Sequence, residues 1–496
     1  MNQVLTRDFE QAFGATRKMH WPLYVLFYAI VLNVPFWLAA STTGLMLRGW
    51  FCIPFMLLGI ACLFLPNVLA PLLVLLVIGI DIVNAICQTY YLSPSQLLSN
   101  MDGAISFSRS RIACGALVLV LALALAAASR YLALRPGESR KRAALALFFL
   151  SLGFIGSDYA QTVVDNHAAR LSHGSMVADS YKLDHFSRSH LSRMPVRSLT
   201  LYRKLLDAEI AGTSGTPQPS PAAFSEVLER SSFAAHGQTG ARPDIVLVLV
   251  ESWGLAGDPA LRSAITAPYD DAGVRSRYNL VQGQVPFFGP TVVGEARELC
   301  GNTLGFRVLR SSSAQLASCA PQRLAATGYR TTAVHGMEGH LFDRVTWYRT
   351  IGFQETWFRS QLSALGLPTC VGPFIGTCDS AIADWIGNRL RGPRDSAPQF
   401  IYWVTLNSHL PVPTPAPLPH PASCGFSSAL AASPALCSWF QLETNVHQSV
   451  ARLAASVQRP TVFILVGDHA PPFTSPDLRA QFSAEDVPYI ALVPNQ

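Results

Sequence analysis

Apolar residues are unevenly distributed along this chain. Five long apolar stretches lie in its first third, whereas the last half carries short apolar runs between polar segments. The long stretches are Trp21–Ala40, Trp50–Leu65, Asn67–Tyr90, Ile112–Leu134 and Ala143–Asp158. Most approach the ~20 residues that a helix needs to cross ~30 Å of hydrocarbon. The pattern predicts an N-terminal transmembrane domain of five helices over residues 1–159, although only Pro66 divides the second stretch from the third.

Basic residues give the predicted helices an orientation. Arg7, Arg17 and Lys18 precede the first stretch, and a second basic group separates the fourth from the fifth: Arg130, Arg135, Arg140, Lys141 and Arg142. The positive-inside rule places both groups in the cytoplasm if the N-terminus is inside and five spans follow. The remaining chain would then lie outside the cytoplasm, on an uncleaved multi-pass anchor in the inner (plasma) membrane.

The net charge of +6 follows the same division. Residues 1–160 hold eleven Lys and Arg against six Asp and Glu, and the remainder holds 26 against 25. The basic excess is therefore a signature of topology, and no nucleic-acid partner is indicated. No Walker loop or dinucleotide fingerprint occurs in the chain.

Residues 160–241 are predicted to connect the membrane domain to an exported one. Apolar and basic positions alternate with helical spacing up to about residue 210, which fits an amphipathic helix at the membrane surface or, equally, a solvated helix. The positions are Leu191, Met194, Val196, Leu199, Leu201, Leu205 and Leu206, with Arg193, Arg197, Arg203 and Lys204. Ala211–Ala223 then has the composition of a linker.

Residues 242–496 have the pattern of an α/β domain. Short apolar runs typical of strands buried on both faces alternate with helical segments such as Val292–Cys300 and Ser380–Arg391, which predicts a mostly parallel central sheet. The candidate strands are Ile245–Val250, Arg330–Val334, Phe400–Thr405, Thr461–Val466 and Tyr489–Val493.

Ten cysteines divide between the two regions. Four lie in the apolar stretches, where small apolar packing is the ordinary role. The other six (Cys300, Cys319, Cys370, Cys378, Cys424 and Cys437) lie in the region expected to be exported. An even number in an oxidising compartment predicts disulfides. Pairing of neighbours (300–319, 370–378 and 424–437) is the simplest of ~15 connectivities, and the others stay open.

Polar residues that suit a metal follow two of the buried runs. Glu251 comes directly after Ile245–Val250, and Asp468 and His469 come after Thr461–Val466. In parallel sheets, ligands gather beyond the carboxyl ends of the strands. Two carboxylates and an imidazole suit Mn²⁺ or Zn²⁺, with Mg²⁺ as a third candidate. Taken singly, each residue would more often be a surface group or a helix cap.

Thr291 is the candidate nucleophile. It follows the turn Gly289-Pro290 and is expected to open a helix, where free backbone N–H groups favour a phosphate. A coordinated cation lowers the effective pKa of a hydroxyl and makes it a nucleophile. Judged on its local sequence alone, an ordinary N-cap threonine is the commoner role.

Three further residues suit phosphate contacts, and two acids have open roles. His335 and Arg344 follow a strand, and His409 ends another in Asn407-Ser408-His409. Imidazole and guanidinium groups bind phosphoryl oxygens, and His409 is a candidate proton donor to a leaving group. Asp379 opens a helix and is expected to cap it. Asp81 lies inside an apolar stretch with Asn84 and Gln88 on one face, which fits a headgroup groove or interhelical hydrogen bonds.

In combination, these motifs resemble the membrane-anchored phosphoglycerol and phosphoethanolamine transferases of the alkaline phosphatase and sulfatase superfamily, with the lipoteichoic acid synthase group most similar. The resemblance rests on strand–Glu251, Thr291 forty residues later, His335…Arg344, Asn407-Ser408-His409-Leu410-Pro411 and Gly467-Asp468-His469. It also covers the run Gly294-Glu295-Ala296-Arg297-Glu298-Leu299-Cys300.

The resemblance implies roles for individual residues. Glu251, Thr291, Asp468 and His469 would hold one divalent metal ion, and Thr291 would also carry the phosphoryl group. His335, Arg344 and His409 would contact the phosphate or its headgroup, beside the aromatic Phe342. Met337 stands where some members carry a polar residue, so the headgroup stays undecided.

The function implied is transfer of phosphoglycerol from a membrane phospholipid to a periplasmic or cell-surface glycan through a phospho-threonine. A phosphoethanolamine transferase is the first alternative, and a phosphodiesterase or sulfatase the second. Cys319-Ala320-Pro321-Gln322-Arg323 matches the C-x-P-x-R motif in which sulfatases convert cysteine to formylglycine. It lies well past Thr291, where the nucleophile is expected, so this alternative is the weaker one. A non-catalytic scaffold for glycan export is the third.

Overall fold

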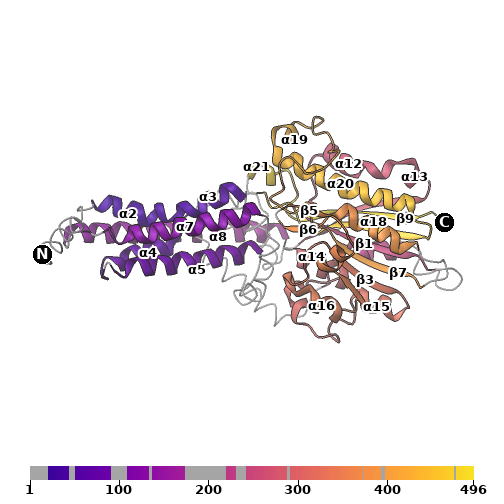
Figure 1. The fold of residues 1–496 in the computed structure, drawn as a ribbon, viewed down its shortest axis with the longest axis horizontal. Coiled ribbons are helices and arrows are strands. Elements are labelled where there is room, and N and C mark those ends of the chain that lie inside the picture. The colour runs from indigo at the N-terminus through magenta and orange to yellow at the C-terminus, as the bar shows by residue number, and fades with distance from the viewer. Residues whose placement is uncertain are drawn as a thin grey trace, which may run out of the picture. The chain divides into compact units, whose positions relative to one another are not determined.

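The computed structural model describes most of the chain. The described residues are 20–43, 51–66, 68–90, 109–132, 134, 137–173, 219–230, 242–287, 291–372, 374–391, 397–473 and 476–495. They fall into two compact units (Figure 1). The first contains the helices up to α8, and the second contains the elements from α11 onward.

The first unit is helical. Its elements are α2 (Trp21–Ala29), η1 (Val31–Asn33), α3 (Val34–Thr43), α4 (Ile53–Cys62), α5 (Ala70–Tyr90), α7 (Arg109–Ser129) and α8 (Glu138–His173). Two windows in the described residues are long and apolar enough to cross a membrane, Trp21–Leu38 and Ile112–Ser129, while Ile53–Cys62 and Ala70–Val83 are shorter apolar helices. Two of the five predicted spans thus have the required length and composition, and the five-helix domain stays a prediction.

Polar residues predicted in or near this unit are only partly described. The Asp81 side chain on α5 is buried. The side chains of Asn84 and Gln88, expected on the same face, lie outside the described residues, as do the amphipathic positions predicted between residues 191 and 206.

The second unit is built on a seven-stranded sheet of order β2-β9-β8-β1-β7-β3-β4, beside a two-stranded β5-β6 hairpin. The strands are β1 (Asp244–Val250), β2 (Tyr278–Pro286), β3 (Arg330–His335), β4 (Glu355–Trp357), β5 (Thr369–Val371), β6 (Ile375–Thr377), β7 (Gln399–Val404), β8 (Thr461–Gly467) and β9 (Asp486–Pro494). Strands β8, β1, β7, β3 and β4 are parallel, and β9 is antiparallel to both of its neighbours. The prediction of a mostly parallel sheet is confirmed.

The five predicted strands are all present, and four strands were missed: β2, β4, β5 and β6. Every residue of β1 and β8 is buried, as expected of strands covered on both faces. Strand β2 lies at the edge of the sheet, and its burial is interrupted by exposed positions such as Gln282 and Gln284. Because polar residues interrupt its sequence, β2 lacks the continuous apolar run by which a central strand is recognised.

Helices cover both faces of the sheet. They are α11 (Ala223–Arg230), α12 (Pro259–Thr266), η5 (Ala267–Asp270), α13 (Ala272–Arg275), α14 (Thr291–Cys300), η6 (Gly305–Arg310), α15 (Ala320–Ala326), η7 (Leu341–Asp343), α16 (Arg344–Thr350), α17 (Arg359–Ala364), α18 (Asp379–Leu390), α19 (Ser428–Ala432), α20 (Pro434–Ser456) and α21 (Pro476–Arg479). Figure 1 shows α12 and α20 on one side of the sheet and α15 and α16 on the other.

Side chains on one face of β7 connect the sheet to the helices that cover that face. Phe400 and Tyr402 on β7 pack against Phe224 of α11 and Tyr348 of α16, with ring centroids 5.5 and 6.1 Å apart. The contact of Phe224 brings α11 into the second unit, ahead of the domain start predicted near Arg242. The linker boundaries drawn from composition stay a prediction.

Candidate metal centre and phosphate site

The parallel register brings the predicted metal ligands to one edge of the sheet. Val250 at the end of β1 pairs with Gly467 at the end of β8, so the residues that follow them are neighbours in space. Ligand atoms of Glu251, Asp468 and His469 all lie within 4.8 Å of one another, and all three side chains are buried. Residues 217 positions apart therefore meet because their strands are adjacent.

Thr291 completes this group as the first residue of α14. Its Oγ1 donates a hydrogen bond of 3.1 Å to Oε2 of Glu251. One turn later, a Cβ on Gly294 would lie only 3.2 Å from the Cα of Asp468, so glycine allows this close approach of the helix. We call Glu251, Thr291, Asp468 and His469 the metal cluster.

Hydrogen bonds orient the metal cluster toward a shared centre. Oδ1 of Asp468 accepts hydrogen bonds from the backbone N–H of Ser252 at 2.8 Å and of His469 at 2.7 Å. Its Oδ2 is buried and accepts none from the described residues. Nδ1 of His469 lies 3.0 Å from the carbonyl of Ala470, which identifies it as the protonated nitrogen. Nε2 then presents its lone pair 3.3 Å from Oδ2 of Asp468.

The electrostatics of the metal cluster call for a cation. Burial, and next the charge of Glu251, raise the pKa of Asp468 to about 7, although His469 opposes the shift. Two buried carboxylates, an imidazole nitrogen and a hydroxyl form a donor set suited to Mn²⁺ or Zn²⁺. An orphaned carboxylate oxygen aimed at these donors fits a metal ligand better than a structural acid.

Sequence reasoning missed three residues that hold Glu251. Its N–H donates to Thr405 Oγ1 at 2.9 Å, and Ser408 Oγ donates to its carbonyl at 2.6 Å. Ser252 donates to Oε1 at 2.9 Å and has φ of 61°, a left-handed conformation that costs energy in a non-glycine residue. Only their positions next to Glu251 and next to His409 could have pointed to Ser252 and Ser408, and Thr405 was indicated only as the end of the predicted strand Phe400–Thr405.

His335 ends β3 and is a neutral acceptor. Its Nδ1 lies 3.0 Å from the carbonyl of Val404, so Nε2 keeps the lone pair. Burial, followed by the charge of Arg344, lowers the pKa of His335 to about 3, with a smaller contribution from His409. His335 therefore lies within electrostatic range of both Arg344 and His409, and we call these three residues the clamp cluster.

His409 is anchored by its own loop and by Asp379. Its Nδ1 lies 2.6 Å from the carbonyl of Leu410, and its ring packs edge-on against Phe374 with centroids 4.8 Å apart. The expectation that Asp379 caps α18 was wrong, because its carboxylate accepts hydrogen bonds from the N–H groups of Leu406 and Asn407 in the loop that carries His409. Burial, then the charge of Glu251, raise the pKa of Asp379 to about 7 against these bonds.

Arg344 already has an anionic partner inside the protein. Its Nε and Nη2 donate to Oε1 of Glu295 at 2.9 and 2.6 Å, and Tyr348 donates its hydroxyl to Oε2. The guanidinium lies over the ring of Phe342, 5.2 Å from its centroid. Burial lowers the pKa of Arg344, but Glu295 and Tyr348 outweigh it and raise the pKa overall. The sequence indicated Glu295 only through the run that follows Thr291.

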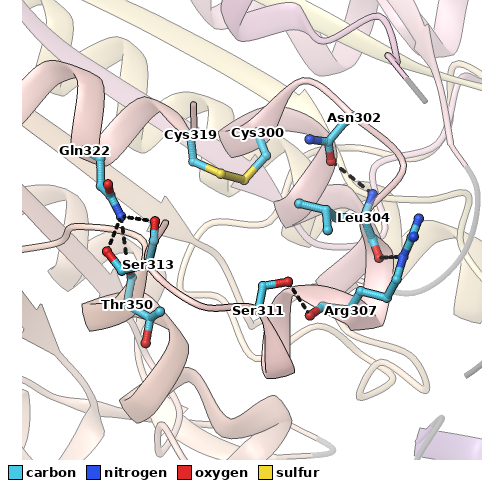
Figure 2. The surroundings of a disulfide bond; sticks show 9 residues. All are labelled: Cys300, Asn302, Leu304, Arg307, Ser311, Ser313, Cys319, Gln322 and Thr350. Carbon is cyan, nitrogen blue, oxygen red and sulfur yellow. Dashed lines mark hydrogen bonds between the residues drawn. A yellow bond between two sulfur atoms is a disulfide. The ribbon is translucent and has the colours of Figure 1, made fainter. Parts of the chain in front are cut away.

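The six cysteines of the second unit form the three predicted neighbour pairs: Cys300–Cys319, Cys370–Cys378 and Cys424–Cys437. Figure 2 shows the first, which joins the end of α14 to the residue before α15, with Gln322 donating to Ser313 and Thr350 beside it. Because Cys319 is buried in a disulfide, its thiol is not available for conversion to formylglycine. The C-x-P-x-R match is therefore a structural coincidence.

Comparison with known proteins supports this kind of domain. Residues 275–496 match the protein-family model described as Sulfatase, a range that includes Thr291, Asp468 and His469 and begins after Glu251. A search of curated protein sequences found no match.

Several solved structures are similar at low identity. The lipoteichoic acid synthase LtaP from Listeria monocytogenes shares 14% identity, with a TM-score of 0.40 over 58% of this chain and 71% of that one. The Streptococcus pyogenes phosphoglycerol transferase GacH, solved with sn-glycerol-1-phosphate, shares 14% at 0.33 over 55% and 78%. The C-terminal periplasmic domain of Escherichia coli EptC shares 11% at 0.32 over 52% and 74%. At these TM-scores the similarities do not bear on the substrate.

Proposed function

With residues 275–496 forming a domain of the sulfatase family, within the alkaline phosphatase superfamily, we propose that the protein is a metal-dependent transferase. It moves phosphoglycerol from a membrane phospholipid to a hydroxyl of a glycan outside the cytoplasm. The observation that carries this proposal is a hydroxyl, Thr291 Oγ1, placed 3.1 Å from Glu251 in a buried group of metal-ligand side chains. Water-excluded hydroxyls at such sites act as covalent nucleophiles.

Two displacements at phosphorus make up the reaction. In the first, Thr291 Oγ1 forms a bond to phosphorus and its proton passes to Glu251, its hydrogen-bond acceptor. The bond from phosphorus to the diacylglycerol oxygen breaks, and that oxygen leaves with a proton for which His409 is the candidate donor. In the second, the acceptor oxygen bonds to phosphorus and its proton passes to His409, which gave up a proton in the first step. The Thr291–phosphorus bond breaks, and Thr291 regains its proton from Glu251. A divalent ion held by the metal cluster would lower the pKa of the threonine hydroxyl and neutralise phosphoryl charge.

The donor is assigned to the membrane because of the N-terminal helices. Trp21–Leu38 and Ile112–Ser129 are apolar enough to anchor the chain in a bilayer, so a lipid headgroup can reach a catalytic domain held at the surface. Phosphoglycerol is preferred to phosphoethanolamine because of the resemblance of the Asn407-Ser408-His409 and Gly467-Asp468-His469 motifs to that group. The domain is placed outside the cytoplasm, where its three disulfides persist.

The test supplies the detergent-solubilised full chain with Mn²⁺ and headgroup-labelled phosphatidylglycerol or phosphatidylethanolamine. We expect diacylglycerol release from phosphatidylglycerol and a labelled phosphoryl group on Thr291 by mass spectrometry. Thr291→Val, which keeps the shape but lacks the hydroxyl, should lose at least ~10³-fold of the activity. Thr291→Ser is the matched control and should keep part of it.

Other outcomes identify the alternatives. Release of phosphoethanolamine would change the donor, and release of free headgroup without an acceptor would make the enzyme a hydrolase. No turnover of either lipid with Mn²⁺, Zn²⁺ or Mg²⁺ would favour the non-catalytic scaffold. A Thr291→Val variant as active as the wild type would remove the nucleophile from the mechanism.

A further inference from the structure

Glu295 lies between the nucleophile helix and the clamp cluster. It follows Thr291 by one turn on α14, and its side chain is fully buried. Both of its oxygens accept hydrogen bonds: Oε1 from two nitrogens of Arg344, and Oε2 from the Tyr348 hydroxyl. A carboxyl group surrounded by donors acts only as an acceptor, which is the ionised form. Glu295 therefore carries a negative charge against the guanidinium.

The Arg344–Glu295 pair lowers the net positive charge available to a bound phosphate. Arg344 is the permanently cationic member of the clamp cluster, since its guanidinium stays protonated and buried His335 is neutral. Both members of the Arg344–Glu295 pair are at most 2% exposed, so water screens neither charge. The arginine is thus neutralised before a substrate arrives, and Nη1 is the nitrogen that takes no part in the pair.

Phosphodiesters and phosphomonoesters differ in the charge they bring. A diester carries one negative charge, whereas a monoester carries nearly two at neutral pH because its second pKa is ~6. A buried site accepts an anion only as far as it can balance the charge. A free arginine would help to balance the second charge, and an arginine already paired with a buried carboxylate would not.

We propose that Glu295 is a specificity-determining residue, which neutralises Arg344 and so makes the site select phosphodiester monoanions over phosphomonoester dianions. The inference rests on the proposed function, because it needs a phosphoryl group between Thr291 and Arg344. Glu295 also joins α14 to α16, and this fixes the guanidinium relative to the nucleophile helix.

The experiment measures kcat/KM of the full chain with Mn²⁺ for bis(p-nitrophenyl) phosphate and p-nitrophenyl phosphate, and follows the diester-to-monoester ratio. In Glu295→Gln, which frees the charge of Arg344, the ratio should fall by at least ~10-fold through a gain on the monoester. Arg344→Gln leaves an unbalanced carboxylate and should raise the ratio. The double variant, neutral on both sides, should return close to the wild-type ratio even where total activity is low.

Glu298→Gln is the matched control on the same helix. Glu298 is also buried and paired with an arginine, Arg297, at 2.6 Å, but that pair holds the carbonyls of Gly467 and Pro286 and does not contact Arg344. Its ratio should stay at the wild-type value. Equal ratios in folded Glu295→Gln and Glu298→Gln would overturn the proposal, as would a wild type that prefers the monoester.

Two further measurements keep the test decisive. If Glu295→Gln does not fold, Tyr348→Phe removes one donor to Glu295, and its ratio should shift in the direction of Arg344→Gln because the carboxylate is less well compensated. An unchanged ratio in both Tyr348→Phe and Arg344→Gln would overturn the proposal. If the wild type releases no diacylglycerol but cleaves the synthetic diester, the proposed donor fails and the role of Glu295 stands. If neither ester is cleaved, calorimetric binding of dimethyl phosphate and inorganic phosphate decides, and tighter binding of inorganic phosphate would count against it.

Discussion

The metal cluster and the clamp cluster lie at the same edge of the sheet but have opposite electrostatic designs. The first follows β8 and β1 and presents two buried carboxylates, one with an oxygen that accepts no hydrogen bond from the described residues. The second follows β7 and β3, and its arginine is balanced by a buried glutamate. The carboxylates of the metal cluster need a bound cation to balance their charge, whereas the charge of Arg344 in the clamp cluster is balanced by Glu295 within the protein. The difference indicates which half is built around a cation.

The largest loss of stability is expected when Glu295, the partner of Arg344 in the clamp cluster, is removed. Glu295→Ala leaves the buried guanidinium of Arg344 without a partner, which costs ~3–5 kcal/mol of the free energy of unfolding. Denaturant unfolding of the solubilised chain, followed by tryptophan fluorescence, measures the loss. Glu355→Ala is the control, because its pair with Arg389 is partly exposed and should contribute only ~0–1 kcal/mol. Similar losses in the two variants would show that the pair is not a structural anchor.

Changing Asp468 should weaken metal binding by the metal cluster without unfolding the protein. Asp468→Asn keeps the shape and the acceptor for Ser252 but loses the charge of the orphaned oxygen, so Mn²⁺ affinity should fall by ~100-fold or more. Calorimetric titration of Mn²⁺ into the metal-depleted protein gives the affinity. Asp477→Asn, an exposed site on α21, should leave it unchanged. Wild-type affinity in Asp468→Asn would separate this carboxylate from the metal.

Acid should destabilise the second unit through His447, a buried residue of α20. This imidazole lies 3.0 Å from the Tyr269 hydroxyl and 4.4 Å from the ring of Trp253, just after Glu251, and burial lowers its pKa from 6.5 to about 3. A base with a lowered folded pKa contributes stability that is fully present above the unfolded pKa and lost as the pH falls toward the folded one. Lowering the pH from ~7.5 to ~5 should therefore remove ~2 kcal/mol.

His447→Gln should remove that share of the acid sensitivity, measured as the free energy of unfolding at the two pH values. His335, with its pKa also lowered to about 3, keeps a second share in the variant. The exposed His420→Gln should behave as the wild type. If the stability of His447→Gln falls with pH as steeply as that of the wild type, the imidazole is not held neutral.

Much of the site could be predicted because its residues sit at the ends of strands. The apolar runs before Glu251 and Asp468 are long enough to identify buried parallel strands, and such strands end at a common edge. The disulfide pairing could also be predicted, because each cysteine pairs with its neighbour in the sequence, 8 to 19 residues away. The strands that were missed lack such long apolar runs. Strand β2 lies at the sheet edge and has exposed glutamines, and β4, β5 and β6 have only three residues each.

The amino-acid sequence by itself determined the parallel α/β domain, the order of the metal-ligand candidates and the apolar character of the N-terminal third, because periodicity and strand-end position are local properties. Only the tertiary structure decided that Glu295 neutralises Arg344, that Asp379 holds the loop of His409, and that Cys319 is a disulfide partner. Those outcomes depend on which side chains meet across the packed layers. The energy of a buried charge or thiol is set by that partner, and no local pattern encodes it.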